Sequence, residues 1–121
     1  MKSPFIAVVD DDVALCSSLA DLIQSSGYRV EQFLSAETFL MSASLLSFDC
    51  IVADVYMPGK SGIRLVQELH ERGIMTPVIL ITGQTEKRLD VEAISTGAKC
   101  LLRKPFEMSA LLENIESSIH G

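Results

Sequence analysis

The chain of 121 residues has the length of one domain, and 48% hydrophobic with 21% charged residues is typical of a folded protein. Ten basic against sixteen acidic residues give a net charge of -6, which argues against a free-standing nucleic-acid binder. The sequence has no apolar run long enough to span a membrane, and we expect no signal peptide, because its first residues show neither an apolar h-region nor a small-residue cleavage site. Its three widely spaced cysteines are expected to be reduced thiols of a cytoplasmic protein.

Five short β-type runs alternate along the chain with segments of helical period. The runs cover residues 5–9, 28–33, 50–53, 78–81 and 100–102. The first, third and fourth runs are apolar throughout, which is typical of parallel strands buried on both faces. The second run carries Arg29 and Glu31 and is expected at an edge of the sheet.

The segments between these runs show the spacing and the end signals of helices. The last segment places five apolar residues on one helical face: Met108, Leu111, Leu112, Ile115 and Ile119. Helices are expected to end before Gly27, Gly73 and Gly97, and to begin after the N-caps Asp12 and Ser35. Five strand–helix units predict a doubly wound α/β domain over residues 1–121, with a five-stranded parallel sheet flanked by five helices.

Polar residues follow four of the five predicted strands. In an open α/β sheet, ligands bind outside the carboxyl ends of the strands. The residues that reach this edge are Asp10, Asp11, Asp12, Asp54, Thr82 and Lys104. Their convergence on one edge predicts a functional site there.

Three of these carboxylates, those of Asp10, Asp11 and Asp54, would repel one another. Two unit charges about 5 Å apart at an effective dielectric constant of about 20 repel by roughly 3 kcal/mol. A divalent cation such as Mg²⁺ would offset this repulsion, because it prefers carboxylate oxygens and water as ligands. Asp12 taken alone is more simply explained as a helix cap.

A carboxylate beside such a cation can attack phosphorus and form an acyl phosphate. The three oxygens of the transferred group then need positive charge and hydrogen-bond donors around them. The ammonium of Lys104 can contact one oxygen, and the hydroxyl of Thr82 can contact another.

The chain resembles the response-regulator receiver domain, the phosphoacceptor module of two-component signalling, over essentially its whole length. Four stretches carry the resemblance, and they are VVDDD at 8–12, DVYMPGKSG at 54–62, ITG at 81–83 and KPF at 104–106. Residues 56–59 and 80–83 are most similar to the FixJ-type subgroup, whose members usually carry a C-terminal helix-turn-helix.

The resemblance implies that Asp54 is the phosphoacceptor for a histidine kinase. It also implies that Asp11, Asp54 and the carbonyl of Tyr56 bind Mg²⁺, while Asp10 acts through water. The sheet order would then be 2-1-3-4-5. The domain would be a signalling module rather than an enzyme, acting only in its own phosphotransfer and dephosphorylation.

Further implications concern the switch and the output. Thr82 and Lys104 would bind the phosphoryl group, and the bond between Lys104 and Pro105 would be cis. Phosphorylation would alter the face formed by helix 4, strand 5 and helix 5, and so change dimerisation or an output, expected to be transcription. DNA would be bound by a C-terminal domain outside this chain, and neither DNA nor a membrane by the receiver itself.

Residues around the site and on the neighbouring elements refine this picture. Tyr56 and Gln84 occupy positions that tune dephosphorylation in the family, and we expect Tyr56 to shield the acyl phosphate in part. Leu101 stands where the family usually has Tyr or Phe, so we expect a core residue there rather than an aromatic switch. Lys99 is expected at the surface.

The helix before Gly97 should expose five charges, those of Glu86, Lys87, Arg88, Asp90 and Glu92.

Two other classes of function stay open. A haloacid-dehalogenase-type phosphatase would use Asp10-x-Asp12, but Ala14 replaces its usual Thr, no acidic pair follows the fourth strand, and there is no room for a cap domain. A receiver-like module that never takes phosphate would usually lack the acidic pair, the acceptor or the lysine, and all of these are present.

Overall fold

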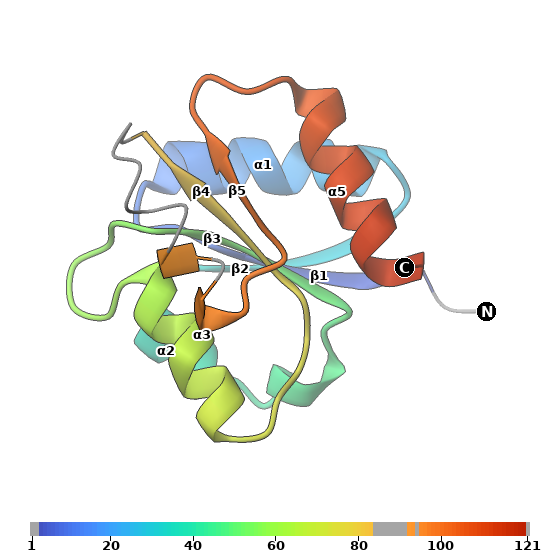
Figure 1. Ribbon diagram of the computed structural model, residues 1–121. Helices are drawn as coiled ribbons and strands as arrows, with labels where there is room; N and C mark the ends of the chain where they lie inside the picture. Colours follow the sequence, from blue (N-terminus) through green and yellow to red (C-terminus); the bar gives the residue numbers. More distant parts are fainter. Residues whose placement is uncertain (1–2, 84–91, 94, 121) are drawn as a thin grey trace.

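The computed structural model describes residues 3–83, 92–93 and 95–120. These residues form three layers, with one parallel sheet between two layers of helices (Figure 1). The strands are β1 (Phe5–Val9), β2 (Arg29–Phe33), β3 (Cys50–Asp54), β4 (Val78–Thr82) and β5 (Cys100–Arg103). They pair in the order β2-β1-β3-β4-β5, which confirms the predicted topology and the predicted edge position of β2. Each strand agrees with its predicted range to within one residue at either end.

Helices cover both faces of the sheet. Helices α1 (Val13–Ser25) and α5 (Met108–His120) lie on one face, and α2 (Ala36–Leu40) and α3 (Gly62–Glu71) lie on the other (Figure 1). A short 3₁₀ turn, η1, spans Leu45–Ser47. Of the fourth predicted helix (helix 4), which was expected to end before Gly97, residues 92–93 and 95–96 are helical, and the rest lies outside the described residues. No helix within the described part of the chain is long and apolar enough to cross a membrane.

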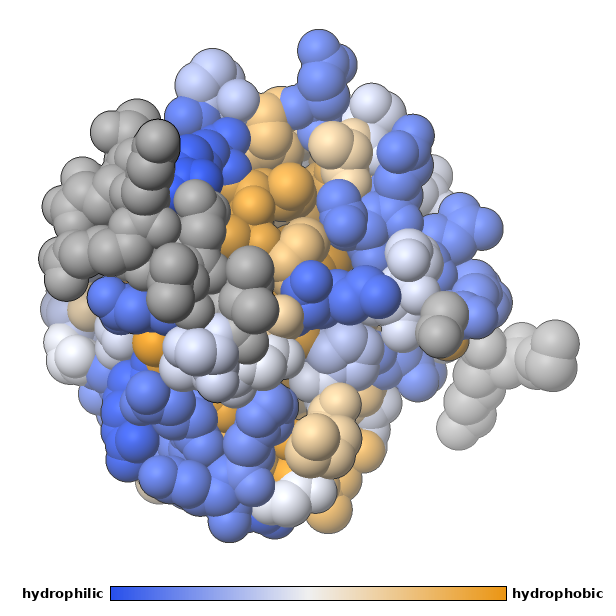
Figure 2. Space-filling model, viewed as in Figure 1, coloured by the Kyte–Doolittle hydropathy of each residue, from blue (hydrophilic) through white to orange (hydrophobic). Residues whose placement is uncertain are grey.

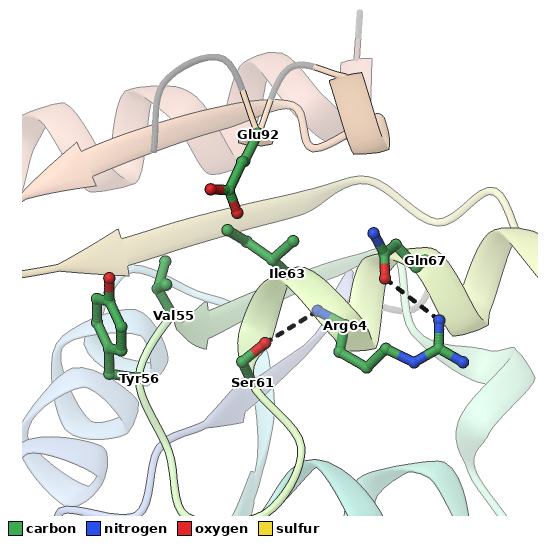
Figure 3. Close-up of a pocket in the computed structure, with 7 residues that line it drawn as sticks. All are labelled: Val55, Tyr56, Ser61, Ile63, Arg64, Gln67 and Glu92. Carbon is green, nitrogen blue, oxygen red and sulfur yellow. Dashed lines mark hydrogen bonds between the residues drawn. The ribbon is translucent and has the colours of Figure 1, made fainter. Parts of the chain in front are cut away.

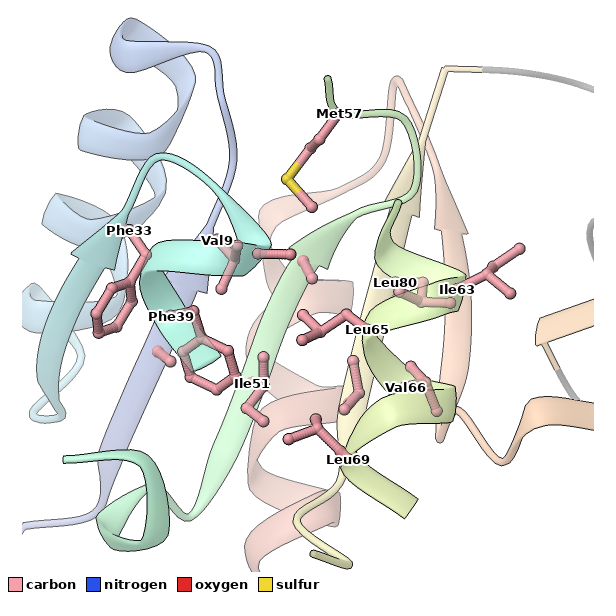
Figure 4. Close-up of a cluster of buried hydrophobic side chains, with 14 of the residues drawn as sticks. Val9, Phe33, Phe39, Ile51, Met57, Ile63, Leu65, Val66, Leu69 and Leu80 are labelled. Atoms are coloured by element: carbon pink, nitrogen blue, oxygen red, sulfur yellow. The ribbon is translucent and has the colours of Figure 1, made fainter. Parts of the chain in front are cut away.

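Successive residues of the central strands point alternately into two separate hydrophobic cores. Each central strand is therefore apolar along its whole length. In β1, Ala7 and Val9 face α2 and α3, whereas Ile6 and Val8 face α1 and α5. The α2–α3 core is rich in aromatic rings, and Phe33 and Phe39 meet edge to face with centroids 5.2 Å apart (Figure 4). The α1–α5 core is mainly aliphatic.

The predicted helix signals are confirmed. The side chain of Asp12 accepts a hydrogen bond from the N–H of Leu15 at 3.1 Å, and Ser35 caps α2 in the same way. The glycines at 27, 73 and 97 all have positive φ, which is the left-handed conformation that glycine adopts without steric cost.

The strand register brings the predicted site residues to one edge. Val9 pairs with Ala53, so the next residues, Asp10 and Asp54, leave neighbouring strands side by side. Thr82 pairs with Arg103, and the residue after Arg103 is Lys104. The parallel sheet therefore gathers residues that are up to 94 positions apart along the chain.

Candidate functional site

Three carboxylates form what we call the acid corner, namely those of Asp10, Asp11 and Asp54. One carboxylate oxygen from each lies within 4.8 Å of the others. Asp10 is buried, Asp54 is half-buried and Asp11 is exposed, so solvent reaches the corner at Asp11. The structure thus brings together the three carboxylates that the sequence predicted to converge.

Burial sets the electrostatics of this corner. The pKa of Asp10 is raised above its ordinary value of 3.8, mainly by burial and further by the charge of Asp54, although the N–H of Asp12 donates to Asp10 Oδ1 at 2.9 Å. The pKa of Asp54 is also raised by burial, against the opposing effect of Lys104. Both carboxylates are therefore harder to ionise than ordinary aspartates without a cation.

Lys104 and Thr82 complete the site from the other half of the sheet. The Nζ atom of Lys104 lies 3.7 Å from Oδ2 of Asp54, a charge pair rather than a hydrogen bond. The backbone N–H of Lys104 donates to the carbonyl of Thr82 at 2.8 Å, and Thr82 is fully buried at the end of β4. The peptide bond between Lys104 and Pro105 is cis, as expected.

The loop between β3 and α3 folds closely around Asp54. The N–H of Tyr56 donates to Asp54 Oδ1 at 3.3 Å, and the N–H of Gly62 donates to the carbonyl of Val55 at 2.9 Å. A Cβ atom at position 62 would lie 2.4 Å from the backbone oxygen of Asp54. Only glycine fits there, and this steric role of Gly62 was not predicted from the sequence. Its place at a helix start, instead of after a helix end, was the available signal.

The donor set of the acid corner fits Mg²⁺. This ion takes oxygen ligands at short range and binds through one or two carboxylates while keeping several waters. The corner offers carboxylate oxygens from Asp10, Asp11 and Asp54 close enough to share one ion. The repulsion among these carboxylates is the physical reason for a cation to bind.

A pocket of about 330 Å³ lies beside the site, between α3, Tyr56 and Glu92 (Figure 3). Tyr56 is 46% exposed. Glu92 was expected to be exposed but is half-buried, because it faces the first turn of α3 across this pocket (Figure 3). Gln84 and the charges at 86, 87, 88 and 90 lie outside the described residues.

Two other expectations are met. Leu101 is half-buried and packs against the α2–α3 core, and Lys99 is exposed. Asp12 caps α1 and is exposed, so its carboxylate is already used in the fold. This use of Asp12 weighs against the phosphatase alternative, which needs Asp12 for chemistry.

A second group of charges, which the sequence did not predict, lies at the far end of the same loop. We call it the tip network, and it consists of Glu37, Lys60, Glu68 and Arg72. Glu37 accepts the backbone N–H of Lys60 at 3.1 Å, the side chains of Lys60 and Glu68 are paired, and Arg72 donates to Glu68 at 2.6 Å. Hydrophilic side chains cover this side of the molecule over α3 (Figure 2).

Comparison with known proteins agrees with this geometry. Residues 6–116 match the model of the response regulator receiver domain. The transcriptional regulatory protein FixJ of Azorhizobium caulinodans is 44% identical over 114 residues, which are 94% of this chain and 54% of FixJ. The response regulator protein TmoT of Ectopseudomonas mendocina is 38% identical over 94% of this chain and 52% of its own length. The chain thus spans about half the length of these relatives.

Solved structures show the same fold. A crystal structure described as FixJ-N superposes with a TM-score of 0.88 at 34% identity, covering 99% of this chain and 96% of the other. The response regulator StyR superposes with a TM-score of 0.90 at 38% identity, covering 98% of this chain and 60% of that one.

Proposed function

Because the chain belongs to the response regulator receiver domain family, we propose that Asp54 accepts a phosphoryl group from a sensor histidine kinase. An oxygen of the Asp54 carboxylate would bond to phosphorus while the phosphorus–nitrogen bond of the phosphohistidine breaks, and the imidazole would leave with the electron pair. The observation that carries this proposal is the convergence of two further carboxylates and one ammonium on the half-buried carboxylate of Asp54.

Mg²⁺ is the proposed cofactor, held by Asp11, Asp54 and the Tyr56 carbonyl, with Asp10 acting through water. When bound, the ion would supply positive charge that offsets carboxylate repulsion and stabilises charge on the phosphoryl oxygens. Asp10 keeps a fixed orientation for this role, because it is buried and accepts the N–H of Asp12.

Lys104 and Thr82 are proposed to bind the transferred group. The ammonium of Lys104 is already beside Asp54 and would move from the carboxylate to a phosphoryl oxygen. The hydroxyl of Thr82 would donate to another oxygen. Because the N–H of Lys104 donates to the carbonyl of Thr82, a movement of either residue would be transmitted to both β4 and β5.

The output is proposed to act through the face formed by helix 4, β5 and α5, with a homodimer as one product. Apolar surface over β5, beside α5, supports this choice (Figure 2), and all four residues of β5 are half-buried. The names of the relatives support transcription regulation as the final effect, through a domain outside this chain. The receiver itself is proposed to bind neither nucleic acid nor membrane.

The proposed compartment is the bacterial cytoplasm, where the free thiols of Cys16, Cys50 and Cys100 would stay reduced. There the domain would act stoichiometrically, as a phosphoacceptor that promotes only its own phosphotransfer and dephosphorylation.

The deciding experiment is intact-mass analysis after incubation with Mg²⁺ and acetyl phosphate. We expect one added phosphoryl group on the wild type, and none without Mg²⁺ or on Asp54→Asn. Catalytic turnover of external phosphate esters would favour the phosphatase instead. A lack of any adduct on a short time course, together with no beryllofluoride binding, would favour an interaction module that never takes phosphate.

A further inference from the structure

Glu37 of α2 holds the tip of the loop between β3 and α3. Its Oε2 atom accepts a hydrogen bond from the backbone N–H of Lys60 at 3.1 Å, across 23 positions of sequence. The side chain of Lys60 is paired with Glu68 of α3. The tip is therefore held to α2 by its backbone N–H at Lys60, and to α3 by the side chain of Lys60.

Gly59 shows how closely Glu37 packs against this loop. Gly59 has φ of +78°, and a Cβ atom there would lie 2.5 Å from Glu37 Oε2. Glycine at this position therefore permits the left-handed turn and also leaves room for the carboxylate. A larger residue would strain the turn and displace the carboxylate from the amide of Lys60.

The loop that Glu37 holds is the one that carries the carbonyl of Tyr56. Between Tyr56 and Lys60, the side chain of Met57 is buried in the α2–α3 core. At the base of the loop, Gly62 donates to the carbonyl of Val55. The loop is thus fixed at its base, its middle and its tip, and Glu37 and the Lys60 side chain are contacts that fix the tip.

We propose that Glu37 is a positioning residue for the metal site. By accepting the Lys60 N–H, it keeps the loop in the conformation in which the Tyr56 carbonyl can join Asp11 and Asp54 around Mg²⁺. The proposal rests on the proposed function, because that function makes the Tyr56 carbonyl a ligand. Holding the loop before the ion arrives lowers the conformational entropy that binding must remove.

The test is a calorimetric Mg²⁺ titration of the wild type and four variants. Glu37→Ala and Glu37→Asp remove or retract the acceptor, and we expect each to weaken the Kd about fivefold. Glu37→Gln keeps an acceptor oxygen without the charge, and we expect its Kd to stay within about twofold of the wild type. The matched control is Glu113→Ala on the exposed face of α5.

A second readout needs no metal. In the metal-free protein, we expect the Lys60 amide to exchange hydrogen faster in Glu37→Asp than in the wild type, and at the wild-type rate in Glu37→Gln. This readout separates loop positioning from the long-range attraction between the Glu37 carboxylate and Mg²⁺. Glu37→Gln would lose that attraction but keep the hydrogen bond, whereas Glu37→Asp would keep the attraction but lose the hydrogen bond.

Three results would overturn the proposal. Wild-type affinity in Glu37→Asp would mean that the loop does not depend on this hydrogen bond. Equal weakening in Glu37→Gln and Glu37→Ala would assign the effect to charge. A wild type that does not bind Mg²⁺ would overturn the proposed function itself, and the two failures are therefore distinguishable.

Discussion

The acid corner and the tip network are two groups of charges that adjoin the same loop, one at its base beside Asp54 and one at its tip beside Lys60. They differ in how their negative charges are balanced. In the tip network every anion faces a donor, so Glu37 accepts the Lys60 N–H and Glu68 pairs with both Lys60 and Arg72. Among the described residues, the acid corner sets three carboxylates against the ammonium of Lys104, which lies 3.7 Å from Asp54 Oδ2. A neutralised group stabilises the fold, whereas a group with excess charge indicates where a ligand of opposite charge binds.

The largest expected difference between the two groups is in Mg²⁺ affinity. Asp11→Asn removes an exposed carboxylate from the acid corner, and we expect the Kd for Mg²⁺ to rise more than about tenfold, because the proposed direct ligand loses its charge. Glu68→Gln removes one charge from the tip network and should change the Kd by less than about twofold. Calorimetric titration measures both, and similar losses in the two variants would contradict the distinction.

The next expected difference is the effect of a lost charge on stability. Asp10→Asn keeps an oxygen that can accept the Asp12 N–H but removes the repulsion with Asp54. In EDTA at pH 7, we expect its free energy of unfolding to rise by about 1–3 kcal/mol over the wild type in urea titrations. A fall in the free energy of unfolding would show that neighbouring groups already offset the charge of Asp10.

The pH dependence of that gain follows from the raised pKa of Asp10. The folded protein holds a proton on Asp10 at pH values where the unfolded chain has released it. Without metal, the ionised Asp10 therefore destabilises the wild type, and this destabilisation decreases as pH falls from the raised pKa towards 3.8. The advantage of Asp10→Asn should shrink over the same interval, and a constant advantage would exclude this explanation.

A smaller effect of opposite sign is expected in the tip network. The pKa of Glu68 is lowered from its ordinary value of 4.5, mainly by the hydrogen bond from Lys60. Its stabilising contribution is complete above the ordinary value and is lost as pH falls through the lowered one. Glu68→Gln should therefore be less stable than the wild type at pH 7, and urea titration should show the two converging at acid pH.

The smallest expected effect concerns Tyr56, which lies between Asp54 of the acid corner and Lys60 of the tip network along the chain. Because its ring is half-exposed, Tyr56→Ala should shorten the lifetime of the phosphoryl group by only about two- to fivefold, through easier access of water. Tyr56→Phe keeps the ring and should retain the wild-type lifetime. Mass spectrometry after removal of the phosphodonor measures the decay, and an unchanged lifetime in Tyr56→Ala would count against shielding.

The sequence was sufficient to predict the sheet, because each central strand is buried on both faces and carries no polar break. In β4 for example, Val78 and Leu80 face one core while Ile79 and Ile81 face the other. The convergence of Asp10 and Asp54 also followed from the sequence, since parallel strands end at a common edge.

Other features depend on tertiary placement that no local pattern contains. The hydrogen bond between Glu37 and Lys60 joins a short helix to a loop, and neither segment shows in sequence that they meet. Glu92 reads as a solvated helix residue until α3 is placed opposite it. The position of Gly62 at a helix start indicated that it is unusual, but a glycine in sequence does not reveal what fills the space beside it, which here is the Asp54 backbone.

The exposure of Tyr56 has a practical consequence. The chain has two tyrosines and no tryptophan, so its near-ultraviolet emission comes from tyrosine alone. Tyr28 is half-buried against the α1–α5 core, whereas Tyr56 is exposed two residues from Asp54. A change of charge at Asp54 therefore falls beside one of only two fluorophores, and the unlabelled protein carries its own optical reporter of the site.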